Sequence, residues 1–224
     1  TADSRIYDGT TAATVDHNGV TFNGMISGDD LTASNTIGTF DNKNVGTNKS
    51  VTLLGTTYGG SDVGNYSIAD QTASTADVSV KTLTVSGITA ENKVYDSTTA
   101  AVVGINGVQF DGLVNGDDLS VASTGVFSDK NVADGKTVTL TNDFSGSDVH
   151  NYVITDQATT TADITPKSIT IVGITAASKV YDGATTATLD VTGLVFDGMI
   201  IGDDLNASGS IGTFSDKHAA LNKT

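Results

Sequence analysis

Lys93-Val94-Tyr95-Asp96-Ser97-Thr98-Thr99-Ala100 occurs three times in this chain in nearly the same form, with the other copies beginning at Arg5 and Lys179. The tyrosines stand at positions 7, 95 and 181, so the copies repeat every 88 and 86 residues. A second motif, Gly-Asp-Asp-Leu, keeps the same step at 28–31, 116–119 and 202–205. This period exceeds the roughly 20–45 residues of a solenoid coil. It suits one small domain per copy.

The register of the copies predicts three modules. Residues 1–80 form a first module that lacks its first strand, 81–166 a complete second module, and 167–224 a third module truncated at its C-terminal end. We expect the chain to be a fragment of a longer array. The connection Thr165-Pro166-Lys167 leaves almost no linker, so neighbouring modules should be closely coupled.

Alternation of apolar and polar residues predicts short strands. Lys81 to Ile88 and Lys136 to Thr141 have the period of a half-buried strand. Each copy contains six to eight such runs, separated by Gly- and Asp-rich turns, and no amphipathic helix. The pattern predicts an antiparallel β-sandwich.

The composition excludes several classes of function. The net charge is −15, from 26 acidic and 11 basic residues. This argues against nucleic acid, which is bound through Lys and Arg, and against an anionic membrane surface. The chain has no cysteine, so neither a disulfide scaffold nor a thiolate metal site is possible. No apolar run is long enough to span a membrane.

Four separated motifs together resemble a known repeat. They are the strand Lys167 to Ile174, the Lys-Val-Tyr-Asp-Gly stretch from Lys179, the Gly-Asp-Asp-Leu turn, and Gly-Thr-Phe-Ser-Asp-Lys at 212–217. In this order and spacing they resemble the YDG-type repeat, related to the MBG repeats of very large bacterial surface and secreted adhesins. Among these adhesins are filamentous-haemagglutinin-like proteins exported by two-partner secretion. The resemblance implies an extracellular, non-enzymatic repeat with tandem immunoglobulin-like antiparallel β-sandwich modules. β-Grasp-like modules are the alternative, although they need a helix.

The paired aspartates of the turn motif are the sharpest candidate site: Asp29/Asp30, Asp117/Asp118 and Asp203/Asp204. As calcium ligands they would combine with oxygens of Ser147-Asp148 and Asp129, because calcium takes about 6–8 oxygen ligands. As turn residues, one aspartate would cap the turn and the other would be solvated. Both interpretations stay open. No EF-hand spacing is present.

Catalysis has little support. His17, His150 and His218 fall at non-equivalent positions and have no evident nucleophile beside them. Adjacent carboxylates do not make a glycosidase, which needs two carboxyl groups on opposite sides of a sugar. We therefore predict no enzyme and no catalytic or cofactor-binding residues, with calcium the one metal left open.

The aromatic residues recur in register. We predict that the recurring tyrosines have buried rings whose hydroxyls bond a backbone group across a corner. They are Tyr7, Tyr95, Tyr181, Tyr66 and Tyr152. Exposed rings that stack on a ligand are the alternative. Core positions are predicted for Phe22, Phe110, Phe196, Phe40, Phe127 and Phe214. A Lys–Asn isopeptide bond from Lys93 or Lys179 is a further hypothesis, which the intact mass decides.

The function expected from these features is a stalk or spacer of a bacterial cell-surface or secreted adhesin, which projects a distal binding region. Its expected contacts are neighbouring repeat modules, and a host-surface or matrix ligand is bound elsewhere in the full protein. The alternatives are that the modules bind a host glycan or matrix protein through loops, or self-associate for biofilm cohesion. No nucleic acid and no membrane insertion are expected.

Overall fold

The computed structural model describes residues 1–208 and 211–224. These residues form strands, turns and two short 3₁₀ helices, η1 (Val63–Asn65) and η2 (Val149–Asn151), with no α-helix among them. The predicted all-β class is confirmed. The β-grasp alternative needs a helix that this part of the chain lacks.

The strands fall into three successive groups that follow the sequence repeat. In the first repeat they are β1 (Arg5–Ile6), β2 (Ala12–Ala13), β3 (Thr32–Ser34), β4 (Ile37–Phe40), β5 (Gly46–Leu54), β6 (Thr57–Gly59) and β7 (Ala73–Ser79). In the second they are β8 (Lys81–Ser86), β9 (Thr89–Ala90), β10 (Lys93–Val94), β11 (Ala100–Ala101), β12 (Val103–Gly104), β13 (Gln109–Asp111), β14 (Ser120–Phe127), β15 (Ala133–Ser145), β16 (Tyr152–Thr155) and β17 (Thr159–Thr165). In the third they are β18 (Thr170–Val172), β19 (Thr175–Ala176), β20 (Thr186–Ala187), β21 (Leu189–Asp190), β22 (Val195–Asp197) and β23 (Gly212–Thr213).

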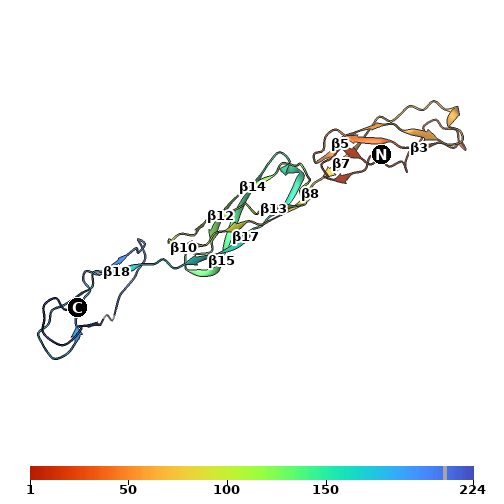
Figure 1. The fold of residues 1–224 in the computed structure, drawn as a ribbon. Helices are drawn as coiled ribbons and strands as arrows, with labels where there is room; N and C mark the ends of the chain where they lie inside the picture. Colours follow the sequence, from red (N-terminus) through yellow and green to blue (C-terminus); the bar gives the residue numbers. More distant parts are fainter. Residues whose placement is uncertain (209–210) are drawn as a thin grey trace. The chain divides into compact units, whose positions relative to one another are not determined.

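The first two repeats share one sheet topology. The main sheet of the first repeat has the order β1-β7-β5-β4-β2, and that of the second has the corresponding order β10-β17-β15-β14-β11. In Figure 1, β5 and β7 lie side by side, as their antiparallel pairing requires. The second repeat also contains a three-stranded sheet with the order β13-β8-β16.

The sheets are mixed. Most of the described pairs are antiparallel, but β1 pairs with β7, β10 with β17, and β16 with β8 in parallel. The first two of these pairs join the Tyr-Asp strand to the last strand of its own repeat. In the second repeat Lys93 lies opposite Ile164.

The cores follow from the alternation of side chains. Val51 and Leu53 of β5 are buried while Thr52 between them is exposed, and Val138 and Leu140 of β15 repeat the pattern. Each fully buried aliphatic side chain is worth about 1.5–3 kcal/mol relative to an exposed one. The predicted core phenylalanines divide into two groups. Phe40 and Phe127 are buried, and only partial burial is found for Phe22, Phe110, Phe196 and Phe214.

The chain forms two compact units whose limits fall inside the second repeat. Unit 1 comprises Thr1–Glu91, Ala101–Val126 and Thr137–Thr161, and unit 2 comprises Asn92–Ala100, Phe127–Lys136 and Ala162–Thr224. One end of the second repeat thus belongs to unit 1 with the first repeat, and its other end belongs to unit 2 with the third. The module limits at 80 and 166 stay a prediction.

Candidate functional site

The paired aspartates meet the tyrosines where one repeat follows another. The carboxylate of Asp117 accepts hydrogen bonds from the Tyr7 hydroxyl at 2.8 Å and the Tyr152 hydroxyl at 2.6 Å. Its other oxygen accepts one from Lys43 Nζ at 2.7 Å. Tyr7 and Lys43 belong to the first repeat, and Asp117 and Tyr152 to the second. The Asp117 side chain is only 2% exposed, so the prediction of a solvated aspartate is wrong at this position.

Further polar contacts surround this carboxylate. Lys43 Nζ also lies 2.8 Å from Asp148 Oδ1. The buried carboxamide of Asn151 accepts a hydrogen bond from the Val45 amide at 3.0 Å and donates one to Asn44 Oδ1 at 3.2 Å. The residues of the first repeat that make these contacts are called its Tyr–Lys end: Tyr7, Lys43, Asn44 and Val45. Those of the second are called its acceptor end: Asp117, Asp148, Asn151 and Tyr152.

Apolar packing accompanies the polar contacts. The rings of Tyr7 and Tyr152 meet edge to face, with centroids 5.6 Å apart and planes at 78°, a favourable aromatic arrangement. Tyr7, Leu83 and Tyr152 belong to one buried cluster with the core of the first repeat. Gly9 follows Tyr7-Asp8 with φ +80°, and a Cβ there would lie 2.6 Å from Val114 Cγ1. A glycine therefore lets the Tyr-Asp loop approach the next repeat this closely.

The acceptor end is held by its own turn. The Asp118 amide donates to Asp148 Oδ2 at 3.0 Å, and the Ser147 amide donates to Asp118 Oδ2 at 3.0 Å. The Tyr152 hydroxyl accepts a hydrogen bond from the Val114 amide at 3.0 Å. The second aspartate of the motif is thus the turn residue that was predicted.

Charge and burial shift the pKa values across the junction. Burial raises the pKa of Asp117, but hydrogen bonds from Lys43, Tyr152 and Tyr7 outweigh it and hold this pKa below its ordinary 3.8. A hydrogen bond with Asp118, and then Lys43, lowers the pKa of Asp148. The two carboxylates in turn raise the pKa of Lys43. Burial, followed by the bond to Asp117, raises the pKa of Tyr152 to about 12. At neutral pH the junction therefore contains two carboxylates, one ammonium group and neutral tyrosines.

The second junction repeats the contact with fewer partners. The Tyr95 hydroxyl donates to Asp203 Oδ1 at 2.8 Å, and Lys130 Nζ lies 3.8 Å from the same oxygen. A cavity of about 210 Å³ lies beside them, lined in part by Val132 and Ile200. Among the described residues Lys130 pairs with the one carboxylate of Asp203, whereas Lys43 pairs with both Asp117 and Asp148.

The predicted burial of the tyrosine rings is confirmed for Tyr7 and Tyr152, whereas Tyr66 and Tyr95 are half-buried. The predicted hydrogen bond to the backbone is correct for one set of tyrosines and wrong for the other. Tyr66 and Tyr152 bond the backbone of their own repeat across a corner, through the amides of Ile26 and Val114. Tyr7 and Tyr95 instead bond a carboxylate of the following repeat. Tyr181 is 60% exposed.

A basic side chain beside each Tyr-Asp motif closes the loop that follows it. Lys93 Nζ contacts Asp96 Oδ1 at 2.8 Å, Thr98 O at 2.9 Å and Ala100 O at 3.1 Å, and lies 5.4 Å from the centroid of the Phe127 ring. The corresponding salt bridges are Arg5–Asp8 at 2.7 Å and Lys179–Asp182 at 2.8 Å. The oxygens around Lys93 come from a carboxylate, a hydroxyl and carbonyls. None belongs to an asparagine, so the geometry gives the isopeptide hypothesis no partner. The recurrence of a basic residue two positions before the tyrosine was the signal for this role.

The histidines and the calcium hypothesis find no shared site in the described residues. His17 Nε2 lies 2.9 Å from Thr36 Oγ1. Across residues 1–208 and 211–224, no group of three or more acidic or histidine side chains is placed to hold a metal ion. The described chain also has no helix long and apolar enough to cross a membrane.

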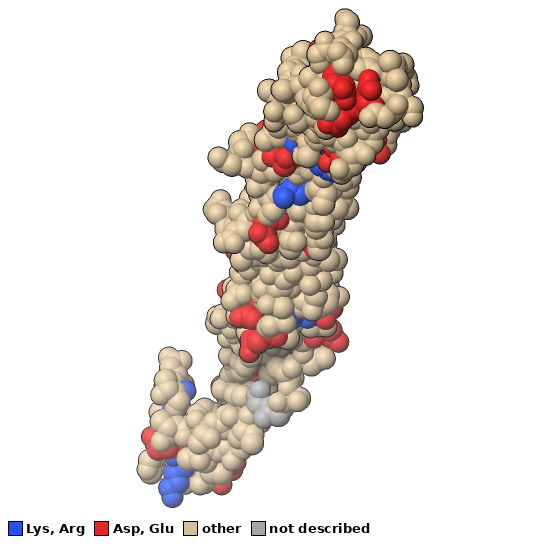
Figure 2. Space-filling view, turned by 90° about the vertical axis from the view of Figure 1, so that its right-hand side faces the viewer, with Lys and Arg blue, Asp and Glu red and all other residues tan. Residues whose placement is uncertain are grey.

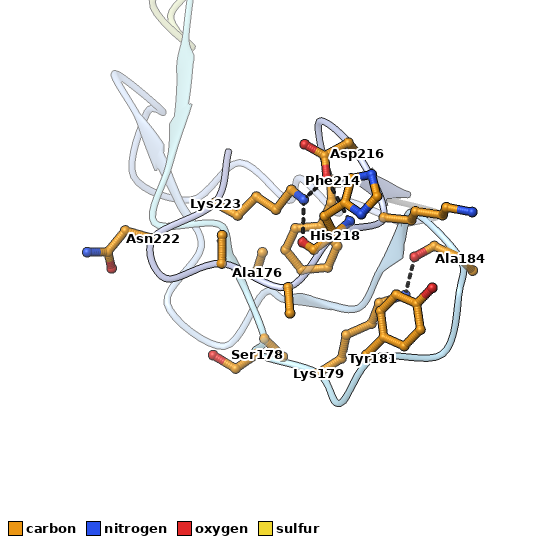
Figure 3. A pocket seen from close by; sticks show the side chains of 14 residues that line it. Ala176, Ser178, Lys179, Tyr181, Ala184, Phe214, Asp216, His218, Asn222 and Lys223 are labelled. Atoms are coloured by element: carbon orange, nitrogen blue, oxygen red, sulfur yellow. Dashed lines mark hydrogen bonds and ion pairs between the residues drawn. The ribbon is translucent and has the colours of Figure 1, made fainter.

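The third repeat contains an open cavity of about 310 Å³ beside its Tyr-Asp loop (Figure 3). Lys179 and Tyr181 lie along one wall, while Phe214, Asp216 and Lys223 lie across from them. In the first two repeats the Tyr-Asp strand pairs with β7 or β17, and the described part of the third repeat includes no such partner strand.

Comparison with known proteins identifies the repeat. The sequence profile of the YDG domain matches the chain three times, over residues 1–74, 79–162 and 165–224. No curated protein and no solved structure matches the chain. The three matches follow the period of the Tyr-Asp and Gly-Asp-Asp-Leu motifs, whose side chains meet at the junctions. The chain belongs to the YDG domain family and carries three copies of the domain.

Proposed function

We propose that these YDG repeats are a non-enzymatic stalk or spacer of a bacterial cell-surface or secreted adhesin, which projects a binding region away from the cell. The contact of Tyr7 and Lys43 with Asp117 and Asp148 carries this proposal. A spacer must transmit position from one repeat to the next, and a buried, charge-assisted contact restricts the motion of neighbouring repeats.

The chemistry of the junction supports a structural role over a catalytic one. Shifted pKa values often mark active sites, but ion-pair networks in a structural contact produce them as well. Here the shifted groups Lys43, Asp117 and Tyr152 bond one another across a junction, and the cation is already paired with two carboxylates.

The charge distribution is compatible with a spacer that stays soluble and does not associate laterally. Eight of the 11 basic side chains form salt bridges within the chain: Arg5, Lys43, Lys49, Lys93, Lys130, Lys136, Lys179 and Lys223. The solvent-facing surface is left with an acidic excess, which favours solubility and opposes lateral association.

Distances between two spin labels, measured by pulsed electron paramagnetic resonance, test the coupling of the first two repeats. The chain has no cysteine, so spin labels attach only to cysteines that are introduced. Thr52→Cys in the first repeat and Thr139→Cys in the second are suitable sites, because both positions are exposed. A spacer predicts one narrow distance distribution, which Lys43→Ala broadens and the exposed Lys167→Ala leaves unchanged. A broad distribution in the parent chain contradicts the proposal.

A binding screen separates the spacer from an adhesive module. The chain should give no signal above background on glycan arrays or immobilised matrix proteins. Saturable binding that is lost on Asp-to-Asn substitution in the turn motifs would instead assign the adhesive function to the repeats.

A further inference from the structure

The Tyr-Asp loop keeps its shape in the first two repeats although its third residue differs. Gly9 has φ +80°, and Ser97 at the equivalent position has φ +63°. In both loops the aspartate accepts hydrogen bonds from the amide and the hydroxyl of the threonine two residues later, at 2.8 to 2.9 Å. Ser97 therefore adds a side chain to a loop with the same hydrogen bonds, at a positive φ that residues other than glycine seldom adopt.

The side chain that faces the loop of the first repeat is held in place. A Cβ at Gly9 would lie 2.6 Å from Val114 Cγ1, well inside the carbon–carbon contact distance of about 3.5–4.0 Å. Val114 is branched at Cβ, so its χ1 is stiff, and it packs against the buried cluster that contains Tyr7. Its amide donates to the Tyr152 hydroxyl at 3.0 Å, and its carbonyl accepts from the Asp117 amide at 3.1 Å. The first junction therefore leaves no space for a side chain at position 9.

The second junction has a larger residue on each side. Ser97 stands where the first junction has Gly9, and Ile200 stands where it has Val114. At the spacing of the first junction the Ser97 Cβ would clash with Ile200, because isoleucine keeps the Cβ branch of valine and adds a methyl group. The two junctions share the bond from tyrosine to aspartate, but they cannot share one distance between loop and turn.

Charge does not distinguish one repeat from another. Tyr7 and Tyr95 each bond the first aspartate of the next turn motif. Lys43 and Lys130 each approach that same aspartate. In Figure 2 most of the basic side chains in view lie beside acidic ones, and the surface between these groups is largely uncharged. A contact that selects one neighbour over another must therefore depend on shape.

We propose that the residue after the Tyr-Asp pair determines which repeat can follow. The glycine at position 9 admits the valine of the second repeat's turn, whereas the serine at position 97 would not. A repeat with the Ser97 loop therefore cannot precede a repeat with the Val114 turn in the geometry of the first junction. The order of the repeats is thus specified by the sizes of two facing side chains. This inference goes beyond the spacer function and does not depend on it.

Hydrogen exchange of the Val45 amide tests the proposal, because this amide bonds Asn151 across the first junction. Gly9→Ser should accelerate its exchange about 5- to 150-fold, since overpacking against the facing valine opens the junction. Val114→Ala removes the facing methyl groups and keeps the backbone amide that bonds Tyr152. In the Val114→Ala chain, the acceleration caused by Gly9→Ser should be at least about fivefold smaller. The strain of serine at positive φ is present in both backgrounds and cancels in this comparison.

Gly9→Ser/Val114→Ile gives the first junction the residue pair of the second. It should accelerate Val45 exchange at least as much as Gly9→Ser, because the contacts of Lys43 and Asn151 hold the original spacing. The Leu53 amide, bonded inside the first repeat, should keep its rate in every variant.

Three results would overturn the proposal. The first is that Gly9→Ser accelerates Val45 exchange equally in both backgrounds or in neither. The second is exchange at the parental rate in Gly9→Ser/Val114→Ile, which would make the two residue pairs interchangeable. The third is an equal acceleration at Leu53 and Val45, because the serine would then unfold the repeat instead of opening the junction.

Discussion

Replacement of Tyr7 by Phe removes one hydroxyl from the junction and leaves the ring in place. The hydroxyl donates to Asp117, a buried carboxylate that keeps Lys43 and Tyr152 as partners. A hydrogen bond to a charged group is worth about 1.5–3 kcal/mol. At about 1.4 kcal/mol per factor of ten, opening of the junction should become about 10- to 150-fold more frequent.

The Val45 amide reports on this opening, because its acceptor is Asn151 of the next repeat. Its hydrogen exchange, measured residue by residue by NMR, should accelerate by the same factor. The Leu53 amide, bonded to Thr72 inside the first repeat, should keep its rate, since the junction opens without unfolding the repeat. Tyr181→Phe is the matched control, because that hydroxyl is exposed. Unchanged exchange at Val45 in Tyr7→Phe, or an equal change in Tyr181→Phe, would refute the reasoning.

Five other changes have defined outcomes. Gly183→Ala should destabilise its repeat by about 1–2 kcal/mol, the cost of a side chain in the left-handed region. Gly9→Ala should lose about 1–3 kcal/mol more, because its new methyl group overpacks against the valine that it faces. Denaturant titration compares the two variants, and equal losses of stability would exclude the steric contact. The lowered pKa of Asp117 means that its stabilisation is present above pH 4 and lost as the pH falls through its folded-state value, so the spin-label distance distribution should broaden only in acid. At the alkaline end, absorbance at 295 nm should show one tyrosine ionising near pH 12, a step absent from Tyr152→Phe. Lys93→Met should lower the melting temperature by several degrees and Lys93→Arg should not, because the first repeat has arginine at the equivalent position. The intact mass of the unmodified chain should equal the mass calculated from its sequence, as expected without an isopeptide bond. EDTA should leave the melting temperature unchanged, and a drop of several degrees would restore the calcium hypothesis.

The strands and cores were predictable because they depend on local alternation. Val51 and Leu53 alternate with threonines, and this period specifies a half-buried strand without knowledge of its neighbours. Whether two strands pair in parallel or antiparallel was harder to predict from the sequence. The parallel pairing of β1 with β7 joins segments about 70 residues apart, and neither segment contains a signal for its partner.

The junction could be predicted only in part, for a different reason. The period shows that Tyr7, Tyr95 and Tyr181 are equivalent, which suggested a common environment within each copy. It does not show whether equivalent residues make contacts inside a copy or with the next one. Tyr7 is buried because a second repeat follows it, and Tyr181 is exposed among the described residues. The interpretation of Asp117 as a solvated turn residue was wrong for the same reason, since its lysine lies 74 positions earlier in another repeat.

The chemical difference between the two ends of a repeat gives the array a direction. Like ends cannot join, because two Tyr–Lys ends would oppose their ammonium groups and two acceptor ends their carboxylates. At both junctions the tyrosine of one repeat bonds the first aspartate of the next repeat's turn motif. Recombination that adds or deletes whole copies therefore alters the length of the protein and leaves this shared contact in place.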